Sequence, residues 1–283
     1  MKKNPRRSQK IAFFLLLLAT LLIVVPVGLV IVIIVQKGLP AMTWQFISDV
    51  PRQGMRAGGI FPAIVGTLYL VVGAIIFALP IGLLAAIYLS EYAKDNFLNR
   101  IIKLAIVNLA GVPSVVYGLF GLALFVIFFK FGASILSGSL TLGIMILPIL
   151  ITASREALES VPYSFREVSY SLGASKWQTI RHIVLPNAIP GILTGTILGL
   201  GRAAGETAPI LFTVAAFYLP RLPSSIFDQA MALPYHLYVI STQVPNVDEK
   251  IRYGTALVLL TLVLSMNLVA IIIRSRFRKR KKW

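Results

Sequence analysis

Two ionisable side chains lie inside a long apolar stretch of the sequence. Arg202 and Glu206 interrupt residues 190–214, which otherwise consist of apolar residues, glycines and threonines. A charged side chain at the centre of a membrane helix costs on the order of 2.5–3.5 kcal/mol on insertion scales, so an ionisable residue there indicates a function. A guanidinium group binds oxyanion oxygens in bidentate geometry, and a carboxylate can accept a hydrogen bond from a hydroxyl of a partly protonated anion. The pair predicts anion recognition, and the alternative interpretation is an ion pair that only fixes helix packing.

Other kinds of chemistry have little support in the chain. The sequence contains no cysteine, which excludes disulfides and thiol chemistry, and it contains only two histidines, His182 and His236, in separate predicted loops. No Gly-x-x-x-x-Gly-Lys-Ser/Thr loop occurs, so ATP binding by such a loop is excluded. The net charge of +17 collects beside the apolar stretches, which disfavours nucleic acid as a partner. We expect no enzyme activity, no metal site and no cofactor bound by this chain.

The elements that position the charged pair are predicted to be transmembrane helices. Hydrophobic residues make up 57% of the chain and charged residues 13%, and the apolar runs approach the ~20 residues that a membrane-spanning helix needs. Six such segments can be identified, at residues 11–35, 66–90, 112–129, 133–154, 190–214 and 255–273. The sequence therefore predicts an all-α membrane protein with six transmembrane helices. The first apolar run exceeds the ~7–15 residues of a cleavable signal peptide, so we expect it to remain as a signal anchor.

Lysine and arginine are distributed unequally between the two sides of these segments. Most of the 27 basic residues lie in the N-terminal tail, the loops after the second and fourth segments, and the C-terminal tail. Positively charged residues favour cytoplasmic loops. Both termini are therefore predicted to be cytoplasmic.

A helical wheel indicates which face of the fifth segment carries the charges. At about 100° per residue, Arg202 and Glu206 share one stripe with Gly191, Gly195 and Gly199, opposite a face of leucine and isoleucine. Glycines four residues apart allow close approach of a second backbone. We expect the charges to face protein or water, on a glycine-lined stripe that meets another subunit.

Residues 160–186, between the fourth and fifth segments, predict two short helices joined by a turn. Apolar residues recur at helical spacing in the first half, at Val161, Phe165, Val168 and Leu172, while Arg166 and Glu167 lie away from that stripe. Gly173 suits a left-handed C-cap, Ser175 and Gln178 suit a capping box, and Pro186 is expected to end the second helix. By periodicity alone, this hairpin either rests on lipid headgroups or docks a protein.

The spacing within the hairpin resembles a known motif. Glu167-Val-Ser, then Gly173, then Ile183-x-Leu185-Pro186 is similar to the motif of binding-protein-dependent ABC importer permeases, although Val168 and Ser169 replace its two alanines. In that family the hairpin seats in a groove of a cytoplasmic ATPase. The resemblance implies that the coupling residues are Glu167, Gly173, Ala174, Ile183, Leu185 and Pro186.

Three further stretches narrow the resemblance. Residues 201–213 (GRAAGETAPILFT), 59–67 (GIFPAIVGT) and 85–92 (AAIYLSEY) resemble phosphate-specific ABC permeases of the PstA type. This implies a type I ABC importer (MetI-like) fold in a bacterial or archaeal cytoplasmic (inner) membrane. Arg202 and Glu206 would then lie on a phosphate pathway. Glu206 would accept hydrogen bonds from phosphate hydroxyls, which sulfate lacks.

The same resemblance implies a set of partners and a division of the chain. The partners would be a PstC-type permease, a dimer of PstB-type ATPases that uses ATP, a periplasmic or lipid-anchored phosphate-binding protein, and membrane lipids. Residues 1–58 would form a tail, anchor helix and first external loop, 59–274 the permease domain, and 275–283 a basic tail. A second external loop, with a short interfacial helix near 226–240, would face the binding protein. The alternatives are a permease for another oxyanion or an organophosphate, and a membrane scaffold that docks a signalling protein.

Overall fold

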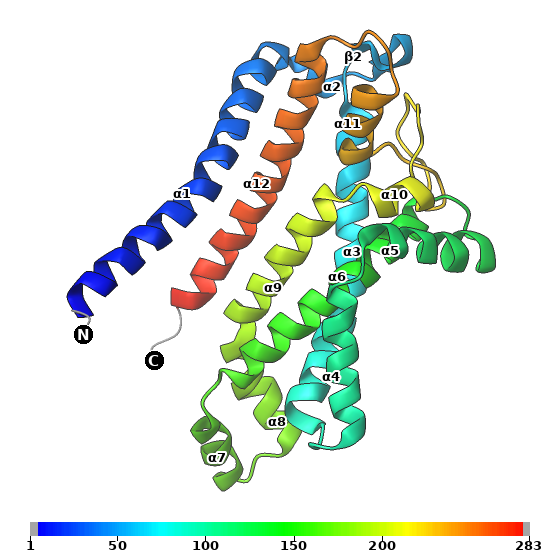
Figure 1. Ribbon diagram of the computed structural model, residues 1–283. Helices are drawn as coiled ribbons and strands as arrows, with labels where there is room; N and C mark the ends of the chain where they lie inside the picture. The colour runs from blue at the N-terminus through cyan, green and yellow to red at the C-terminus, as the bar shows by residue number, and fades with distance from the viewer. Residues whose placement is uncertain (1–4, 280–283) are drawn as a thin grey trace.

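The computed structural model describes residues 5–279, and these residues are mostly helical (Figure 1). The long helices are α1 (Pro5–Gly38), α3 (Phe61–Ile87), α4 (Phe97–Ala110), α6 (Ile135–Glu159), α9 (Leu185–Gly205) and α12 (Glu249–Lys279). The shorter α-helices are α2 (Trp44–Ser48), α5 (Ser114–Gly121), α7 (Tyr163–Ser171), α8 (Lys176–Thr179), α10 (Ala208–Thr213) and α11 (Leu233–Thr242). Three π-helical segments extend them, η3 (Tyr88–Tyr92), η4 (Leu122–Phe128) and η5 (Ile180–Val184), and two 3₁₀ turns occur, η1 (Leu39–Ala41) and η2 (Gln53–Met55). Strands β1 (Pro51–Arg52) and β2 (Ala57–Gly58) pair antiparallel.

Five helical segments of the described chain are long and apolar enough to cross a membrane. The sixth is a bent pair, Phe97–Ala110 followed by Ser114–Phe128, whose halves meet at 102°. The predicted third span at 112–129 is therefore wrong in its position, because α4 runs along the bundle while α5 and η4 turn across it (Figure 1). The basic residues Arg100 and Lys103 in the first half of α4 are typical of a loop, so the sequence did not predict this helix. Pro113, whose ring disfavours helical backbone before it, lies at the bend.

Helix α6 lies at the centre of the bundle, between α3 and α9, and α12 packs on α9 (Figure 1). The core around α6 is apolar, and its fully buried side chains include Leu142, Met145, Ile146 and Leu150. Helix α1 packs against α12 only near one end and is otherwise exposed. Helix α1 begins and α12 ends on the side of the molecule that carries α7, as an even number of spans requires (Figure 1). Residues 275–279 continue α12 rather than forming a tail, and 280–283 and 1–4 lie outside the described residues.

The glycine stripe of α9 packs against α6 of the same chain. A Cβ built on Gly195 would lie 2.5 Å from the Cβ of Ala153, and one on Gly191 would meet the Cβ of Ala157. Gly199 lies beside Ile146 and Leu150 without such crowding. The expectation that this stripe meets another subunit is wrong, because the short connection through residues 160–175 makes α6 and α9 neighbours.

At the opposite end from α7, the loops fold into a small second core. Helix α11 packs against α12 and α3, and the buried Phe46 and Met55 belong to the same cluster. The interfacial helix expected near 226–240 occurs instead at Leu233–Thr242, after Pro223 and a non-helical stretch. His236 of α11 is 2% exposed, and its Nδ1 has no hydrogen-bond partner among the described residues.

Adding a methyl group at Gly195 should destabilise the protein. Gly195→Ala places a Cβ where Ala153 already lies, so α9 and α6 must separate, at a cost of about 1–3 kcal/mol. The measurement is the melting temperature of the purified chain in detergent. Gly28→Ala is the matched control, because a Cβ at Gly28 meets nothing within 4 Å, and it should leave the melting temperature unchanged or slightly higher. Equal melting temperatures for the two variants would contradict the packing described here.

Acidification should destabilise the fold through His236, which lies outside the membrane-spanning helices. Burial lowers the pKa of His236 to about 4. The unfolded imidazole has its ordinary pKa of about 6.5, so below that pH only the unfolded state takes up the proton. The free energy of unfolding should fall as the pH decreases from about 6.5 towards 4, by roughly 3 kcal/mol in total at about 1.36 kcal/mol per pKa unit.

The check is the melting temperature between about pH 7.5 and about pH 5, a window that includes most of the unfolded-state titration. His236→Gln should flatten its decline with decreasing pH. His182→Gln alters an exposed histidine and should leave the decline as in the unmodified chain. A decline of the same size in all three proteins would show that His236 does not contribute.

Candidate functional site

Arg202 and Glu206 lie together at a break in the fifth span. Helix α9 ends at Gly205, Glu206 has extended backbone angles (φ −76°, ψ 138°), and α10 starts at Ala208. Arg202 donates from Nε to Oε1 of Glu206 over 3.4 Å. The prediction of one continuous helix over 190–214 is wrong, and so is the helical-wheel position of Glu206. The two side chains nevertheless meet, because the chain after Gly205 turns across the bundle and leaves Glu206 beside the last turn of α9.

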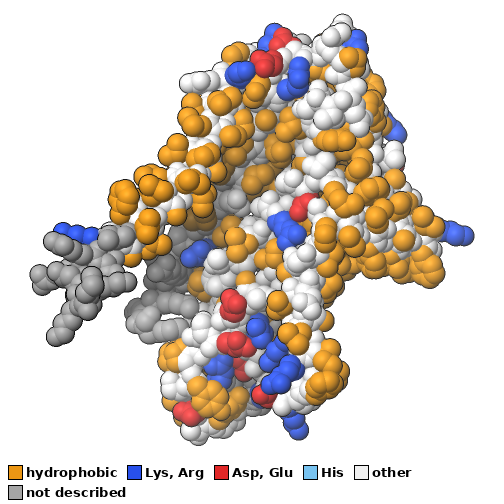
Figure 2. Space-filling view, in the orientation of Figure 1, with side chains coloured by type: hydrophobic (Ala, Val, Ile, Leu, Met, Phe, Trp, Pro, Cys, Tyr) orange, Lys and Arg blue, Asp and Glu red, His pale blue; other side chains and the backbone are white. Residues whose placement is uncertain are grey.

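The pair is partly open to the surface of the chain. The side chain of Arg202 is 29% exposed and that of Glu206 is 19% exposed. Among the residues that the structure describes, Nε is the only nitrogen of Arg202 with a hydrogen-bond partner, so both terminal nitrogens are free to bind a ligand. Tyr117 of α5 lies within electrostatic range of Arg202. Figure 2 shows a basic and an acidic side chain together at mid-height of the visible face, in the region of α9 and α10.

The broken backbone restricts what can surround this site. Within the hydrocarbon region of a membrane, non-helical backbone is tolerated only where protein covers it or where it lines a water-filled cavity. Gly205 is exposed, and Glu206 is only partly buried. The break therefore requires water or a second protein on its open side, and lipid cannot cover it.

The position of the pair along the bundle differs from the expected midpoint of a span. Gly199 packs beside Ile146, which lies near the middle of α6. Arg202 is one turn further along α9, about 4.5 Å at 1.5 Å per residue. The charged pair thus lies between the middle of the bundle and the end opposite α7.

The hairpin of residues 160–186 lies at one end of the molecule, away from this pair (Figure 1). Its turn follows the predicted capping pattern. Gly173 has a left-handed backbone (φ +83°), and the N–H groups of Gly173 and Ala174 donate to the carbonyls of Tyr170 and Ser169. This pair of bonds is a Schellman motif, which places glycine at the residue after the C-cap.

The second half of the hairpin begins as expected but does not end at Pro186. Ser175 and Gln178 form both hydrogen bonds of the capping box. From there the chain stays helical as Lys176–Gly205, so α8, η5 and α9 form one segment. The π-helical turn η5 precedes Pro186 and changes the backbone hydrogen-bond pattern, so Pro186 lies at the start of α9. Ile183 and Leu185, which are half-buried, are therefore the base of the span and not a separate helix.

Several apolar side chains are exposed on the outer surface of the hairpin, among polar and charged ones. Its exposed side chains include Tyr163 (66%), Val168 (60%), Leu172 (83%) and Trp177 (50%). Glu167 is exposed beside them, whereas Val161 is buried against the bundle. The predicted apolar stripe is thus divided, with its first half packed inside and its second half available to a partner.

Sequence reasoning missed two residues at the base of the hairpin. Arg166 was placed away from the apolar stripe, yet it is 7% exposed and forms an ion pair with Glu91 at 2.7 Å. Glu91 lies in η3 at the end of α3. A single carboxylate at the end of an apolar span was the available signal, but its partner is 75 residues away in the chain.

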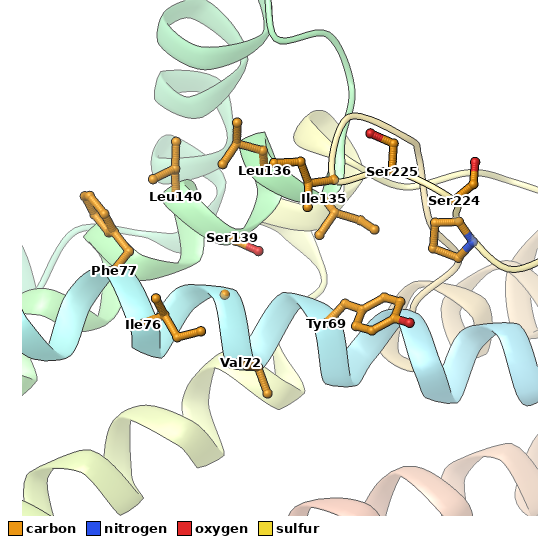
Figure 3. Close-up of a pocket in the computed structure, with 13 residues that line it drawn as sticks. Tyr69, Val72, Ile76, Phe77, Ile135, Leu136, Ser139, Leu140, Ser224 and Ser225 are labelled. Carbon is orange, nitrogen blue, oxygen red and sulfur yellow. The ribbon is translucent and has the colours of Figure 1, made fainter.

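A separate cavity of about 720 Å³ lies between α3, the start of α6 and the loop at 223–226 (Figure 3). Tyr69, Val72 and Ile76 of α3 line one wall, and Ile135, Leu136 and Leu140 of α6 lie opposite. Neither Arg202 nor Glu206 lines it. Its apolar walls do not suit an anion, so the charged pair remains the candidate substrate site.

Comparisons with known proteins agree with this architecture. Residues 78–283 match the family described as the binding-protein-dependent transport system inner membrane component. The chain is 37% identical over 227 residues to the phosphate transport system permease protein PstA 1 of Mycobacterium tuberculosis strain H37Rv, covering 80% of this chain and 73% of that protein. It is 33% identical over 259 residues to the probable phosphate transport system permease protein PstA of Methanocaldococcus jannaschii, covering 91% of this chain and 90% of that protein.

Solved structures give the same fold at low sequence identity. A chain of a bacterial alginate ABC transporter, in complex with a pentasaccharide-bound periplasmic protein, superposes with a TM-score of 0.66 at 15% identity. The alignment covers 95% of this chain and 94% of that one. The expected type I ABC importer (MetI-like) fold is thereby confirmed. This protein is a multi-pass membrane protein and belongs to the family of binding-protein-dependent transport system inner membrane components.

Proposed function

We propose that this chain is a permease subunit of an ATP-driven importer of inorganic phosphate and forms half of the transmembrane pathway. The observation that carries the proposal is the Arg202–Glu206 pair at the break after α9. It presents free guanidinium nitrogens on a surface that lipid cannot cover. The names of relatives at 33% and 37% identity support phosphate as the substrate.

A second permease would complete the pathway. The charged pair is on the surface of this single chain rather than enclosed by it. A partner of the PstC type placed against that face would cover the broken backbone and leave a water-filled passage beside Arg202. The two halves would then surround the anion, and this chain would supply the guanidinium.

Glu206 gives the site a basis for selecting phosphate. At neutral pH phosphate retains one or two hydroxyls, which can donate hydrogen bonds to a carboxylate, whereas sulfate has none. A carboxylate beside the path repels a fully deprotonated anion and accepts a partly protonated one. Discrimination by hydrogen bonds to a substrate hydroxyl is strong, because the analogue that lacks the hydroxyl leaves the buried acceptor unpaired.

The ATPase would dock on the hairpin and move it during ATP hydrolysis. The hairpin's exposed Val168 and Leu172 suit a groove on a cytoplasmic PstB-type ATPase dimer. The hairpin end and both termini would then be cytoplasmic, in agreement with the distribution of basic residues. The loops around α2 and α11, at the other end, would meet an external phosphate-binding protein that delivers the substrate.

Replacement of Arg202 by lysine keeps the positive charge but should still impair phosphate uptake. Arg202→Lys loses the bidentate fork, so we expect phosphate uptake to fall about tenfold or more, given about 1.4 kcal/mol per factor of ten. Uptake of labelled phosphate is measured in cells that carry the variant as their only copy, normalised to membrane content. Arg100→Lys, at an exposed arginine of α4, is the control and should transport normally. Normal uptake by Arg202→Lys would remove Arg202 from the pathway.

Neutralisation of Glu206 tests the selectivity argument. Glu206→Gln should lower phosphate uptake, because the amide oxygen is a weaker acceptor for the phosphate hydroxyl. It should also allow sulfate to compete or enter, because the amide N–H can donate to a fully deprotonated anion. Labelled phosphate and labelled sulfate are followed in parallel. If the variant keeps both normal phosphate uptake and normal sulfate exclusion, Glu206 has no role in selection.

A charge on the apolar surface of the hairpin should detach the ATPase. Leu172→Asp places a carboxylate on a side chain that is 83% exposed, so the isolated permease should fold while copurification of the ATPase is lost. Leu222→Asp, at an exposed leucine of the opposite end, should retain the ATPase. Full retention by Leu172→Asp would show that the ATPase docks elsewhere.

A further inference from the structure

A buried ion pair joins the hairpin to the end of α3. Arg166 of α7 donates from Nη2 to Oε1 of Glu91 at 2.7 Å and from Nε to Oε2 at 3.3 Å. The two side chains are only 8% and 6% exposed. The bidentate geometry sets both the distance and the angle between the two elements.

The same guanidinium also holds the end of α6. Arg166 donates from Nη2 to the carbonyl of Leu158 at 3.0 Å and from Nη1 to the carbonyl of Val161 at 2.8 Å. These carbonyls belong to the last turn of α6 and to the turn that follows it. One side chain thus links α7, the end of α6 and the π-helical end of α3.

Apart from this link, the hairpin is held by its two chain connections and by apolar packing against the bundle. On one side it follows the short turn at 160–162, and on the other it continues through the π-helical turn η5. Helix α3 has no direct chain connection to the hairpin, because α4, α5, η4 and α6 lie between them in the sequence. The two also share a buried apolar cluster, in which Val161 and Ile180 of the hairpin join Ile87 of α3. In addition, the Lys176 ammonium lies over the ring of Tyr92, 4.7 Å from its centroid.

The chemistry of the pair suits a rigid joint. Burying two charges gains little net stability, but removing one partner leaves an uncompensated buried charge, so the pair resists opening. Hydrogen bonds from the guanidinium to two carbonyls fix its orientation further. A pair of this kind holds a defined geometry under load, whereas apolar side chains could slide.

We propose that Glu91 and Arg166 form the joint that carries displacement of the hairpin into α3. Both are positioning residues, since they lie at the hairpin end of the bundle, away from the Arg202–Glu206 pair. This inference rests on the proposed function, in which an ATPase moves the hairpin. With the joint intact, α3, α6 and the hairpin move as one body. With the joint broken, α3 no longer follows the hairpin, and less phosphate is transported for each ATP hydrolysed.

The main test compares two glutamates of the same cavity. Glu91 and Glu159 both line a cleft of about 490 Å³ beside the hairpin, but Glu159 is 48% exposed and its contact with Arg155 is 3.9 Å long. The complete transporter is reconstituted in vesicles with its binding protein, and phosphate uptake and ATP hydrolysis are measured together. Glu91→Gln should hydrolyse ATP at a rate near normal, with phosphate transported per ATP reduced at least severalfold. Glu159→Gln should keep the normal ratio.

An unchanged ratio of phosphate transported to ATP hydrolysed in Glu91→Gln would overturn the proposal, whether both rates stay normal or both fall in proportion. Glu91→Asp retains the charge on a shorter side chain and should give an intermediate ratio. If the unmodified transporter carries a different solute, the proposed substrate fails, but the ratio for that solute still tests the joint.

A distance measurement tests the joint directly. The chain has no cysteine, so spin labels can be placed at Ser164→Cys on α7 and Leu84→Cys on α3, both exposed positions. In the complete transporter the distance distribution should be narrow and equal in the nucleotide-free and ATP-bound states. Glu91→Gln should broaden it or shift it with ATP, and Glu159→Gln should not. A distribution that changes with ATP in the unmodified joint would contradict a rigid link.

Discussion

The absence of water from the membrane interior is the constraint on which the structure depends. Backbone polar groups there must be satisfied within the protein, which leaves helices as the only economical solution for this chain. The constraint also gives meaning to its exceptions. The backbone opens after Gly205, next to the partly exposed Arg202–Glu206 pair, so that opening requires water or a partner. Arg166, in contrast, has each of its side-chain nitrogens bonded.

The two ends of the molecule are joined through continuous helices. The hairpin passes into α9 without interruption, from Lys176 to Gly205, so the surface proposed to receive the ATPase and the break that carries Arg202 belong to one rod. Helix α6 packs against this rod through Gly191 and Gly195 at close range. A displacement at the hairpin reaches α9 through the chain itself, by way of η5, and the proposed Glu91–Arg166 joint carries it to α3.

Local patterns were sufficient wherever a feature depends on a few adjacent residues. The turn at Gly173 and the capping box at Ser175 were predicted correctly, and so was the MetI-like family from the hairpin motif. The same reasoning failed where neighbours decide the outcome. Pro186 does not end its helix because a π-helical turn accommodates it, and residues 112–129 do not form a straight span because α4 supplies half of the crossing. The meeting of Arg202 and Glu206 was expected, although the broken helix that allows it was not.

By itself, the sequence determined that this chain is a helical membrane protein with a hairpin between two spans, because apolar length, capping residues and turn residues act locally. Only the tertiary structure decided which side chains meet. The glycine stripe packs against α6 rather than another subunit, and Arg166 forms an ion pair with Glu91, which is 75 residues away in the chain. A buried charge or a glycine in a helix indicates that some close contact exists. Which residue makes that contact depends on the packing of helices that are distant in the sequence, and no local pattern encodes it.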